Sequence, residues 1–399
     1  MAMVSGKRTL DPAEQAAQLL FRIGFGILCV VLPLAAVFSR RAIVVIAPIG
    51  ILILISAALM MKDSAQPGAS LRRAFTSPAG LAALFLIAWS AMSLAWTPFP
   101  TAGAERLLRV VASLGIAMGA IIALPERMRA SNLYLLSIGI GLSALVALGV
   151  ATLRPELSEP TVLDRAAVLI SLMAWPAVTW LSMKRRTIPA MGIAGAVGAL
   201  ALVLQGATVL PALLVGAVLL GGALNNLRGS AVAFAVSVAI LILGAPLIAL
   251  ALSLLSTQAS GFGRTMQVWA DIIVADPLRL VTGFGIETAL RNRISQALDT
   301  AAPTSLLFEV WYELGVLGAL AMTTVLVASA FSIATLGRTL GSFALGCMGF
   351  GFTLGAMGLG TSQTWWITAL VSTGIAFFAV AHGEYRTQRP TAPPSLKRE

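Results

Sequence analysis

Two glutamates four positions apart, Glu309 and Glu313, are the clearest candidates for acid–base chemistry in this sequence. On a helix, residues at this spacing lie on one face, one turn from each other. The pair could act as a base and a positioning group, or it could form ion pairs with arginines that hold helices together. Because intramembrane ion pairs often only satisfy each other, the residues alone favour the structural interpretation.

Three arginines near the ends of predicted helices, Arg106, Arg165 and Arg264, are candidates for binding an anion. A guanidinium carries a rigid fork of donors that matches phosphate oxygens, which the ammonium group of lysine lacks. A charge in or near the hydrocarbon is costly and usually faces a wet cavity or a partner. We therefore expect these arginines to converge at the outer mouth of a helix bundle. The alternative is that arginine is simply the dominant basic residue of this composition.

Metal and disulfide chemistry are not expected. Cys29 and Cys347 both lie inside apolar runs, which suits small packing residues and argues against a disulfide framework or a cysteine-based metal site. His382 is the only histidine, so the chain has no histidine cluster for zinc or iron. The sequence predicts no metal and no cofactor, although carboxylates could still hold a dissociable divalent ion.

Two smaller motifs favour structure over chemistry. Gly283 and Gly285 allow a tight turn, but no predicted strand precedes them, so a dinucleotide site is not expected. Trp96, Trp365 and Trp366 fall at predicted outer helix ends. They fit an interfacial aromatic belt, although their rings could also stack on sugars.

Membrane helices must position these side chains. The chain of 399 residues is 58% hydrophobic and 11% charged, whereas an average soluble domain has about 25% charged residues. Its mean hydropathy is +0.92. Many runs reach the roughly 20 apolar residues that a helix needs to cross the hydrocarbon. The run from Ala231 to Leu255 is apolar on every side, unlike the alternating strands of a membrane barrel. We therefore predict an all-α polytopic membrane protein.

The apolar runs predict about twelve transmembrane helices, over residues 19–38, 42–61, 80–96, 105–124, 132–152, 163–183, 187–205, 207–224, 230–256, 304–332, 341–360 and 364–382. The chain then divides into a cytoplasmic tail (1–18), nine helices (19–256), a large periplasmic loop (257–303), three helices (304–382) and a disordered cytoplasmic tail (383–399). Apolar residues from Phe262 to Ile273 recur at spacings of three and four, which predicts an amphipathic helix in the loop. Residues 61–78 are predicted to be a plain linker.

Charge indicates the orientation. When the connections are numbered alternately from an inside N-terminus, most basic residues fall inside, so the positive-inside rule places both termini in the cytoplasm. Arg40 and Arg41 are the clear exception. The net charge of +11 comes from small groups between apolar runs, so the lipid bilayer is the expected partner and nucleic acid is not. The first run, from Leu19, is predicted to be an uncleaved helix.

Several motifs together point to a family. The outer loop reads Arg264-Thr265-Met266-Gln267-Val268-Trp269, then Pro277-Leu278, then Gly283 and Gly285, and the next helix reads LFEVWYELGVLG from Leu307 to Gly318. The remaining pieces are Ser93-Leu94-Ala95-Trp96-Thr97 with Arg106 behind it, Asp164-Arg165 before Trp175-Pro176, and Trp365-Trp366. Taken together, these motifs resemble those of the O-antigen ligase and polymerase superfamily, membrane enzymes that join polyprenyl-diphosphate-linked glycans to an acceptor.

The resemblance implies a glycosyltransferase of the bacterial inner membrane that acts on the periplasmic face in cell-surface polysaccharide biosynthesis. Its donor would be a polyprenyl-diphosphate-linked glycan, and its acceptor lipid A core, a growing polymer or a protein. Arg264, Arg165 and Arg106 would bind the diphosphate, and Glu309 or Glu313 would take the proton. Trp269, Gly283, Gly285 and Thr304 would position the loop. No nucleotide or metal would be needed.

One departure concerns the base. Family members usually carry a histidine nine residues before the glutamate of Glu-Leu-Gly, and that position here is Thr304. Threonine is not a base near neutral pH, so either Glu309 or Glu313 substitutes or catalysis is lost. A non-catalytic member of a polysaccharide assembly complex therefore remains an alternative. A transporter is the other, although the sequence shows no inverted repeat and no matching pair of broken helices.

Overall fold

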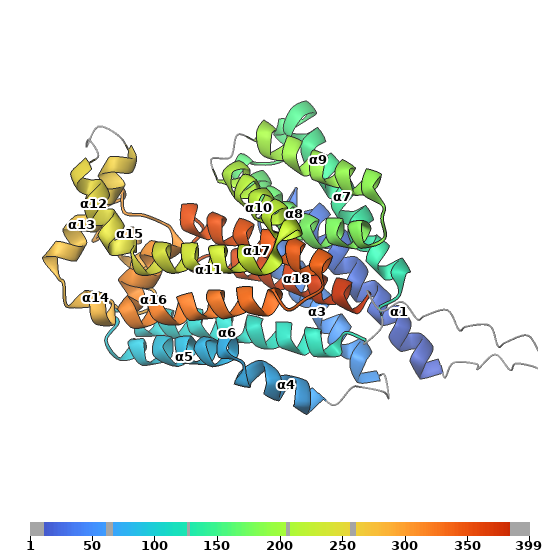
Figure 1. Ribbon diagram of the computed structural model, residues 1–399, viewed down its shortest axis with the longest axis horizontal. Helices are drawn as coiled ribbons and strands as arrows, with labels where there is room; N and C mark the ends of the chain where they lie inside the picture. Colours follow the sequence, from blue (N-terminus) through green and yellow to red (C-terminus); the bar gives the residue numbers. More distant parts are fainter. Residues whose placement is uncertain (1–11, 61–66, 126–127, 205–207, 256–260, 384–399) are drawn as a thin grey trace, which may run out of the picture.

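The computed structural model describes residues 12–60, 67–125, 128–204, 208–255 and 261–383. Every regular element in these ranges is a helix, and several of the long helices run roughly along the long axis of the molecule while others are inclined to it (Figure 1). The helices are α1 (Pro12–Gly26), the π-helix η1 (Ile27–Val31), α2 (Leu32–Ala36), α3 (Ala42–Met60), α4 (Pro67–Thr76), α5 (Pro78–Met92), the 3-10 helix η2 (Ser93–Ala95), α6 (Pro100–Ala123), α7 (Ala130–Leu153), the 3-10 helix η3 (Pro155–Leu157), α8 (Pro160–Met183), α9 (Thr187–Val203), α10 (Val209–Asn225), α11 (Leu227–Leu243), α12 (Ala245–Leu255), α13 (Gly261–Ala275), α14 (Arg279–Thr282), α15 (Thr288–Ile294), α16 (Leu306–Ile333), α17 (Arg338–Met357) and α18 (Thr364–His382).

In the described part of the chain, nine helices are long and apolar enough to cross a membrane, and the bent pair α11 and α12 would make a tenth. The chain is therefore a multi-pass α-helical membrane protein, as its composition predicts. The predicted number of twelve spans is not confirmed. α9 and α10 have only 17 residues each, and the single span predicted over 230–256 is two helices that meet at 68°.

The bend between α11 and α12 has a local cause. Pro246 lacks the N–H that would bond to the carbonyl of Ile242 four residues earlier, so the helix cannot continue straight. The indole Nε1 of Trp311, on α16, donates to this freed carbonyl at 2.6 Å. The bend that Pro246 causes is thus stabilised by a hydrogen bond from Trp311 on another helix.

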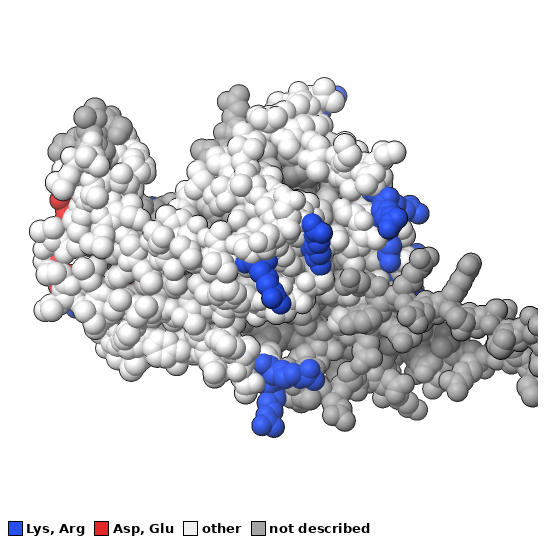
Figure 2. All heavy atoms as spheres, in the orientation of Figure 1, with Lys and Arg blue, Asp and Glu red and all other residues white. Residues whose placement is uncertain are grey.

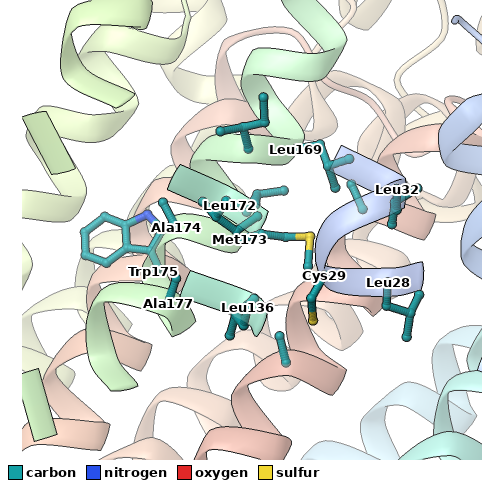
Figure 3. Packing of buried hydrophobic residues seen from close by; sticks show 14 of the residues in the cluster. Leu28, Cys29, Leu32, Leu136, Leu169, Leu172, Met173, Ala174, Trp175 and Ala177 are labelled. Carbon is teal, nitrogen blue, oxygen red and sulfur yellow. The ribbon is translucent and has the colours of Figure 1, made fainter. Parts of the chain in front are cut away.

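Two apolar cores lie in the bundle. The larger core joins α1–α3, α6–α10, α17 and α18. Within it, Cys29 on η1 packs among leucines and Met173 (Figure 3). Both cysteines are buried and free, as predicted. The second core joins α11, α12, α13 and α16 around Trp269, Phe308 and Trp311, and it anchors the segment that follows α12 to the bundle.

Several segments that connect the long helices contain short helices of their own. Within the predicted linker, residues 67–76 form helix α4, which carries Arg72 and Arg73. The predicted loop 257–303 contains α13, α14 and α15, and these gather with α12 at one end of the molecule (Figure 1, left). Helix α13 buries Trp269 and Ile273 while Phe262 is 59% exposed. The tail residues 1–11 and 384–399 lie outside the described residues.

Charged side chains are unevenly distributed on the face shown in Figure 2: acidic side chains appear at the end that carries α13 and α14, and the most prominent basic side chains lie away from that end. Arg264 and Arg279 lie at the acidic end and form ion pairs with Asp299 and Asp276. Helix α4 with Arg72 and Arg73 belongs to the basic part. Helix α17 begins there with Arg338, whose Nε donates to the Leu224 carbonyl at 2.7 Å.

Candidate functional site

One guanidinium and three carboxylates form a buried cluster, called here the Arg106 cluster: Arg106, Glu287, Glu309 and Glu313. Arg106 Nη1 lies 3.0 Å from Glu313 Oε2 and 3.3 Å from Glu287 Oε2, and Nη2 lies 3.7 Å from Glu309 Oε2. No side chain of the four is more than 8% exposed. Buried charges are tolerated only when paired and hydrogen-bonded, and here one arginine serves three acids.

These four charged side chains come from three separate parts of the chain. Arg106 is on the second turn of α6, and Glu309 and Glu313 share one face of α16, as their spacing predicts. Glu287 precedes α15 and has a left-handed backbone, with φ 72°. Of the two interpretations of the glutamate pair, the geometry matches ion pairing with an arginine that joins helices.

A turn before α18 encloses the carboxylate of Glu309. The Thr361 hydroxyl donates to Oε2 at 3.0 Å, the Ser362 amide donates to Oε2 at 3.2 Å, and the Ser362 hydroxyl donates to Oε1 at 2.7 Å. A Cβ on Gly360 would lie 2.0 Å from Oε1, so only glycine allows the turn to close on the carboxylate. Arg106 Nη2 also donates to the Thr361 hydroxyl, at 2.7 Å. Nothing in the sequence marked this turn.

Helix α16 is broken two residues after Glu313. Gly315 has φ 64° and ψ −159°, which interrupts the helix, and the break leaves carbonyls without helical donors. Phe284 N donates to the Tyr312 carbonyl at 2.8 Å, and Gly285 N donates to the Glu313 carbonyl at 2.9 Å. Trp89 Nε1 donates to the Leu314 carbonyl at 2.9 Å.

The glycine turn before α15 is thus pressed against the broken helix. Gly283 and Gly285 have φ 70° and 97°, which confirms the predicted tight turn. A Cβ on Gly283 would lie 2.2 Å from the Glu313 carbonyl oxygen. On the far side of the turn, the Ala289 amide donates to Glu313 Oε1 at 3.2 Å. The turn and the acid are therefore held together from both sides.

The three predicted arginines have three different sets of partners. Arg106 is surrounded by carboxylates, and the Arg165 guanidinium lies 5.4 Å from the centre of the Trp365 ring. Arg264 Nη2 lies 3.4 Å from Asp299 Oδ2, with its side chain 63% exposed. Arg106 and Arg165 both contact residues 361–365. In the described residues, these contacts do not join the three guanidiniums to one another, so the expected convergence on one crevice is not confirmed.

Two further arginines, which the sequence had not singled out, border the cluster. Arg291 Nε lies 3.5 Å from Glu287 Oε1. Arg293 Nη2 donates to the carbonyls of Ala302 and Pro303, at 2.9 and 2.7 Å, and burial lowers the pKa of this guanidinium, with the charge of Glu309 acting in the opposite direction. Glu287 and both arginines follow the glycine pair, and this position was their only sequence signal.

The remaining predicted residues are structural contacts or surface positions. Trp269 is buried and lies edge-on to Phe308, with ring centres 5.4 Å apart. Thr304 is exposed. Trp365 and Trp366 are 7% and 5% exposed, so these two are packed inside the protein and do not form the predicted interfacial belt.

An apolar groove of about 810 Å³ runs between α16, α17 and α18. Its lining begins with Thr361 and Trp366, beside the Arg106 cluster, and continues to Ile333, Leu340 and Ala381 near the opposite ends of the three helices. The groove therefore follows the length of the helices and meets the cluster at Thr361.

The contact between Arg264 and Asp299 predicts a pH dependence. The Ala301 amide, first, and then Arg264 hold the pKa of Asp299 below its ordinary value. A carboxyl with a lowered folded-state pKa stabilises the fold above its unfolded pKa, about 3.9, and this stabilisation is lost as pH falls through the folded value. We expect the hydrogen-exchange protection factor of the Ala301 amide to be constant above about pH 5 and to fall below it. Asp299→Asn should lower it even at neutral pH; an unchanged value would contradict this.

Among the described residues, no group of three or more His, Cys, Asp or Glu side chains is arranged to hold a metal ion. The three carboxylates of the Arg106 cluster face a guanidinium.

Comparison with known proteins identifies no family: no family model matches the chain, and no curated protein is significantly similar to it in sequence.

Proposed function

We propose that this protein is a membrane glycosyltransferase of the O-antigen ligase and polymerase type, which moves a glycan from a polyprenyl diphosphate to an acceptor. The observation that carries the proposal is an apolar groove that ends at a polar site. The groove can take a long hydrocarbon chain by apolar burial, and Thr361 and the Arg106 cluster lie at its end. A donor with a lipid tail and a charged head requires this combination.

Under this proposal the acceptor hydroxyl attacks the anomeric carbon of the donor sugar. The bond from that carbon to the diphosphate oxygen breaks, and the diphosphate leaves with the electron pair. Arg264 and Arg165, which are not held in the buried cluster, neutralise the charge that grows on the leaving group. Arg106 is given a different role, because three carboxylates surround it: it holds Glu309 and Glu313 in place.

The charge distribution supports an orientation. On the visible face, the most prominent basic side chains lie away from the end that carries α13 and α14 (Figure 2), and Arg264 and Arg279 at that end are paired with acids. Because cytoplasmic connections are rich in arginine and lysine, we place the basic part in the cytoplasm. The Arg106 cluster and the mouth of the groove then face the periplasm of a bacterial inner membrane, where lipid-linked glycans await transfer.

Purified protein in liposomes tests the proposal, with a polyprenyl-diphosphate-linked oligosaccharide as donor and a sugar acceptor. Arg264→Ala is expected to slow transfer on the order of 100-fold, because one charge-neutralising donor is lost. Arg154→Ala is the matched control, since Arg154 and Glu156 form another exposed ion pair with the same separation of 3.4 Å. Unchanged transfer by the Arg264 variant would exclude its role, and no transfer by the wild type would exclude the function.

A non-catalytic role in a polysaccharide assembly complex is the second candidate, and Thr304 in the place of a histidine favours it. In that case wild-type liposomes would bind the donor lipid without transferring its glycan. A transporter is less consistent with the broken helix, because protein donors take the carbonyls freed at the break, whereas transporters use such carbonyls for ions. Uptake of a labelled solute by the same liposomes would favour the transporter.

A further inference from the structure

The carboxylate of Glu309 is shielded from any substrate. The residue is 6% exposed, and both oxygens already accept hydrogen bonds from the turn over Gly360, Thr361 and Ser362. Gly360 covers one oxygen closely, since a Cβ there would lie 2.0 Å away. Glu309 therefore cannot take a proton directly from an acceptor sugar, and a group between them is needed.

The hydroxyl of Thr361 meets this need. Thr361 lines the apolar groove and is half-buried, so a molecule at the outer end of the groove can reach it. Its hydroxyl accepts from Arg106 Nη2 at 2.7 Å and donates to Glu309 Oε2 at 3.0 Å. A hydroxyl has one proton and two lone pairs, so one lone pair remains for an incoming donor.

We propose that Thr361 is the catalytic contact residue that passes a proton from the acceptor hydroxyl to Glu309, in the absence of a histidine at position 304. This inference rests on the glycan-transfer function proposed above. As the acceptor oxygen bonds to the anomeric carbon, its proton moves to the Thr361 oxygen and the Thr361 proton moves to Glu309 Oε2. The bond to the diphosphate breaks with its electron pair, so the protein gains one proton and the diphosphate carries the charge.

Arg106 and Ser362 have supporting roles in this scheme. Arg106 donates to the Thr361 hydroxyl, which fixes the direction in which its proton points, toward Glu309. Ser362 also donates to the Glu309 carboxylate, at 2.7 Å, but it does not line the groove. The two hydroxyls thus bond to the same acid, and of these two only Thr361 lines the groove.

Because Thr361 lines the groove and Ser362 does not, variants of these two residues test the proposal. Thr361→Val, Thr361→Ser and Ser362→Ala are compared in liposomes for transfer rate and for binding of the donor lipid. Thr361→Val is expected to lower kcat on the order of 100-fold with donor binding retained, Thr361→Ser to restore the rate, and Ser362→Ala to leave it within about tenfold of the wild type. Folding of each variant is checked by its unfolding temperature.

The possible outcomes distinguish the proton transfer through Thr361, called here the relay, from the proposed glycan-transfer function. If Thr361→Val and Ser362→Ala lose the same amount of activity, Thr361 is only another hydrogen bond to Glu309 and the relay is overturned while glycan transfer stands. If Thr361→Val fails to fold, Thr361→Ser decides, because a folded serine variant with no transfer also overturns the relay. A wild type that transfers no glycan overturns the proposed function itself.

Discussion

Replacing Arg106 with alanine is expected to destabilise the folded protein by about 3–5 kcal/mol, the usual cost of removing one partner from a buried ion pair. The change leaves the carboxylates of Glu287, Glu309 and Glu313 buried and without their shared guanidinium. Arg106→Lys should recover only part of the loss, because an ammonium group lacks the fork that reaches acids on two sides.

The free energy of unfolding, measured by titration with a denaturing detergent, tests this expectation. Arg109→Ala is the control, since Arg109 lies on the same helix but makes an exposed ion pair with Glu105 at 3.9 Å; such pairs contribute about 0–1 kcal/mol. Adding Glu313→Gln to the Arg106→Ala variant should restore stability in part, because it removes one unpaired charge. Equal stability of the Arg106 and Arg109 variants would show that the cluster is not a structural centre.

Gly315→Ala is expected to have the second large effect, a loss of about 3 kcal/mol or more of folding free energy from backbone strain and displacement of the neighbouring turn. The backbone at Gly315, with φ 64° and ψ −159°, is one that only glycine adopts readily. In addition, a Cβ would lie 2.5 Å from the Val281 carbonyl oxygen. The turn that carries Gly283 would have to move away from α16.

Gly149→Ala provides the comparison for this variant. Gly149 lies inside α7, and no atom lies within 4 Å of a Cβ built on it, so alanine there should be neutral or stabilise the helix by up to about 1 kcal/mol. The unfolding temperatures of the two variants, with hydrogen exchange of the Phe284 and Gly285 amides, measure the difference. Retained protection of both amides in Gly315→Ala would disprove the strain argument.

The Arg106 and Gly315 variants both test the segment around Glu313, where a buried acid and a helix break lie close together. The Glu313 carboxylate bonds to Arg106, and its carbonyl accepts from Gly285 N. The Glu-Leu-Gly motif therefore combines a buried acid with a helix break two residues later, and the break allows the glycine turn to dock beside the acid. Loss of either part should release the segment that carries Glu287 from the bundle.

The sequence by itself determined the membrane class and most of the helices. Apolar runs long enough to cross a bilayer leave helices as the main choice for satisfying the backbone. It also determined features whose cause is local: the shared face of Glu309 and Glu313 and the turn at Gly283 and Gly285. The bend before Pro246 has a local cause too, although the apolar run predicted a single straight span there. In each, residues only a few positions apart are related by bonded geometry.

Tertiary structure alone decided which charges meet. Arg106 is separated from Glu287 by 181 residues and from Glu313 by 207, and no spacing rule acts over such distances. The sequence grouped Arg106 with Arg165 and Arg264 because all three share one residue type, whereas packing of α6 against the elements around α16 placed Arg106 among acids. A charge buried between helices takes the partners that packing brings within reach, because it must be neutralised there.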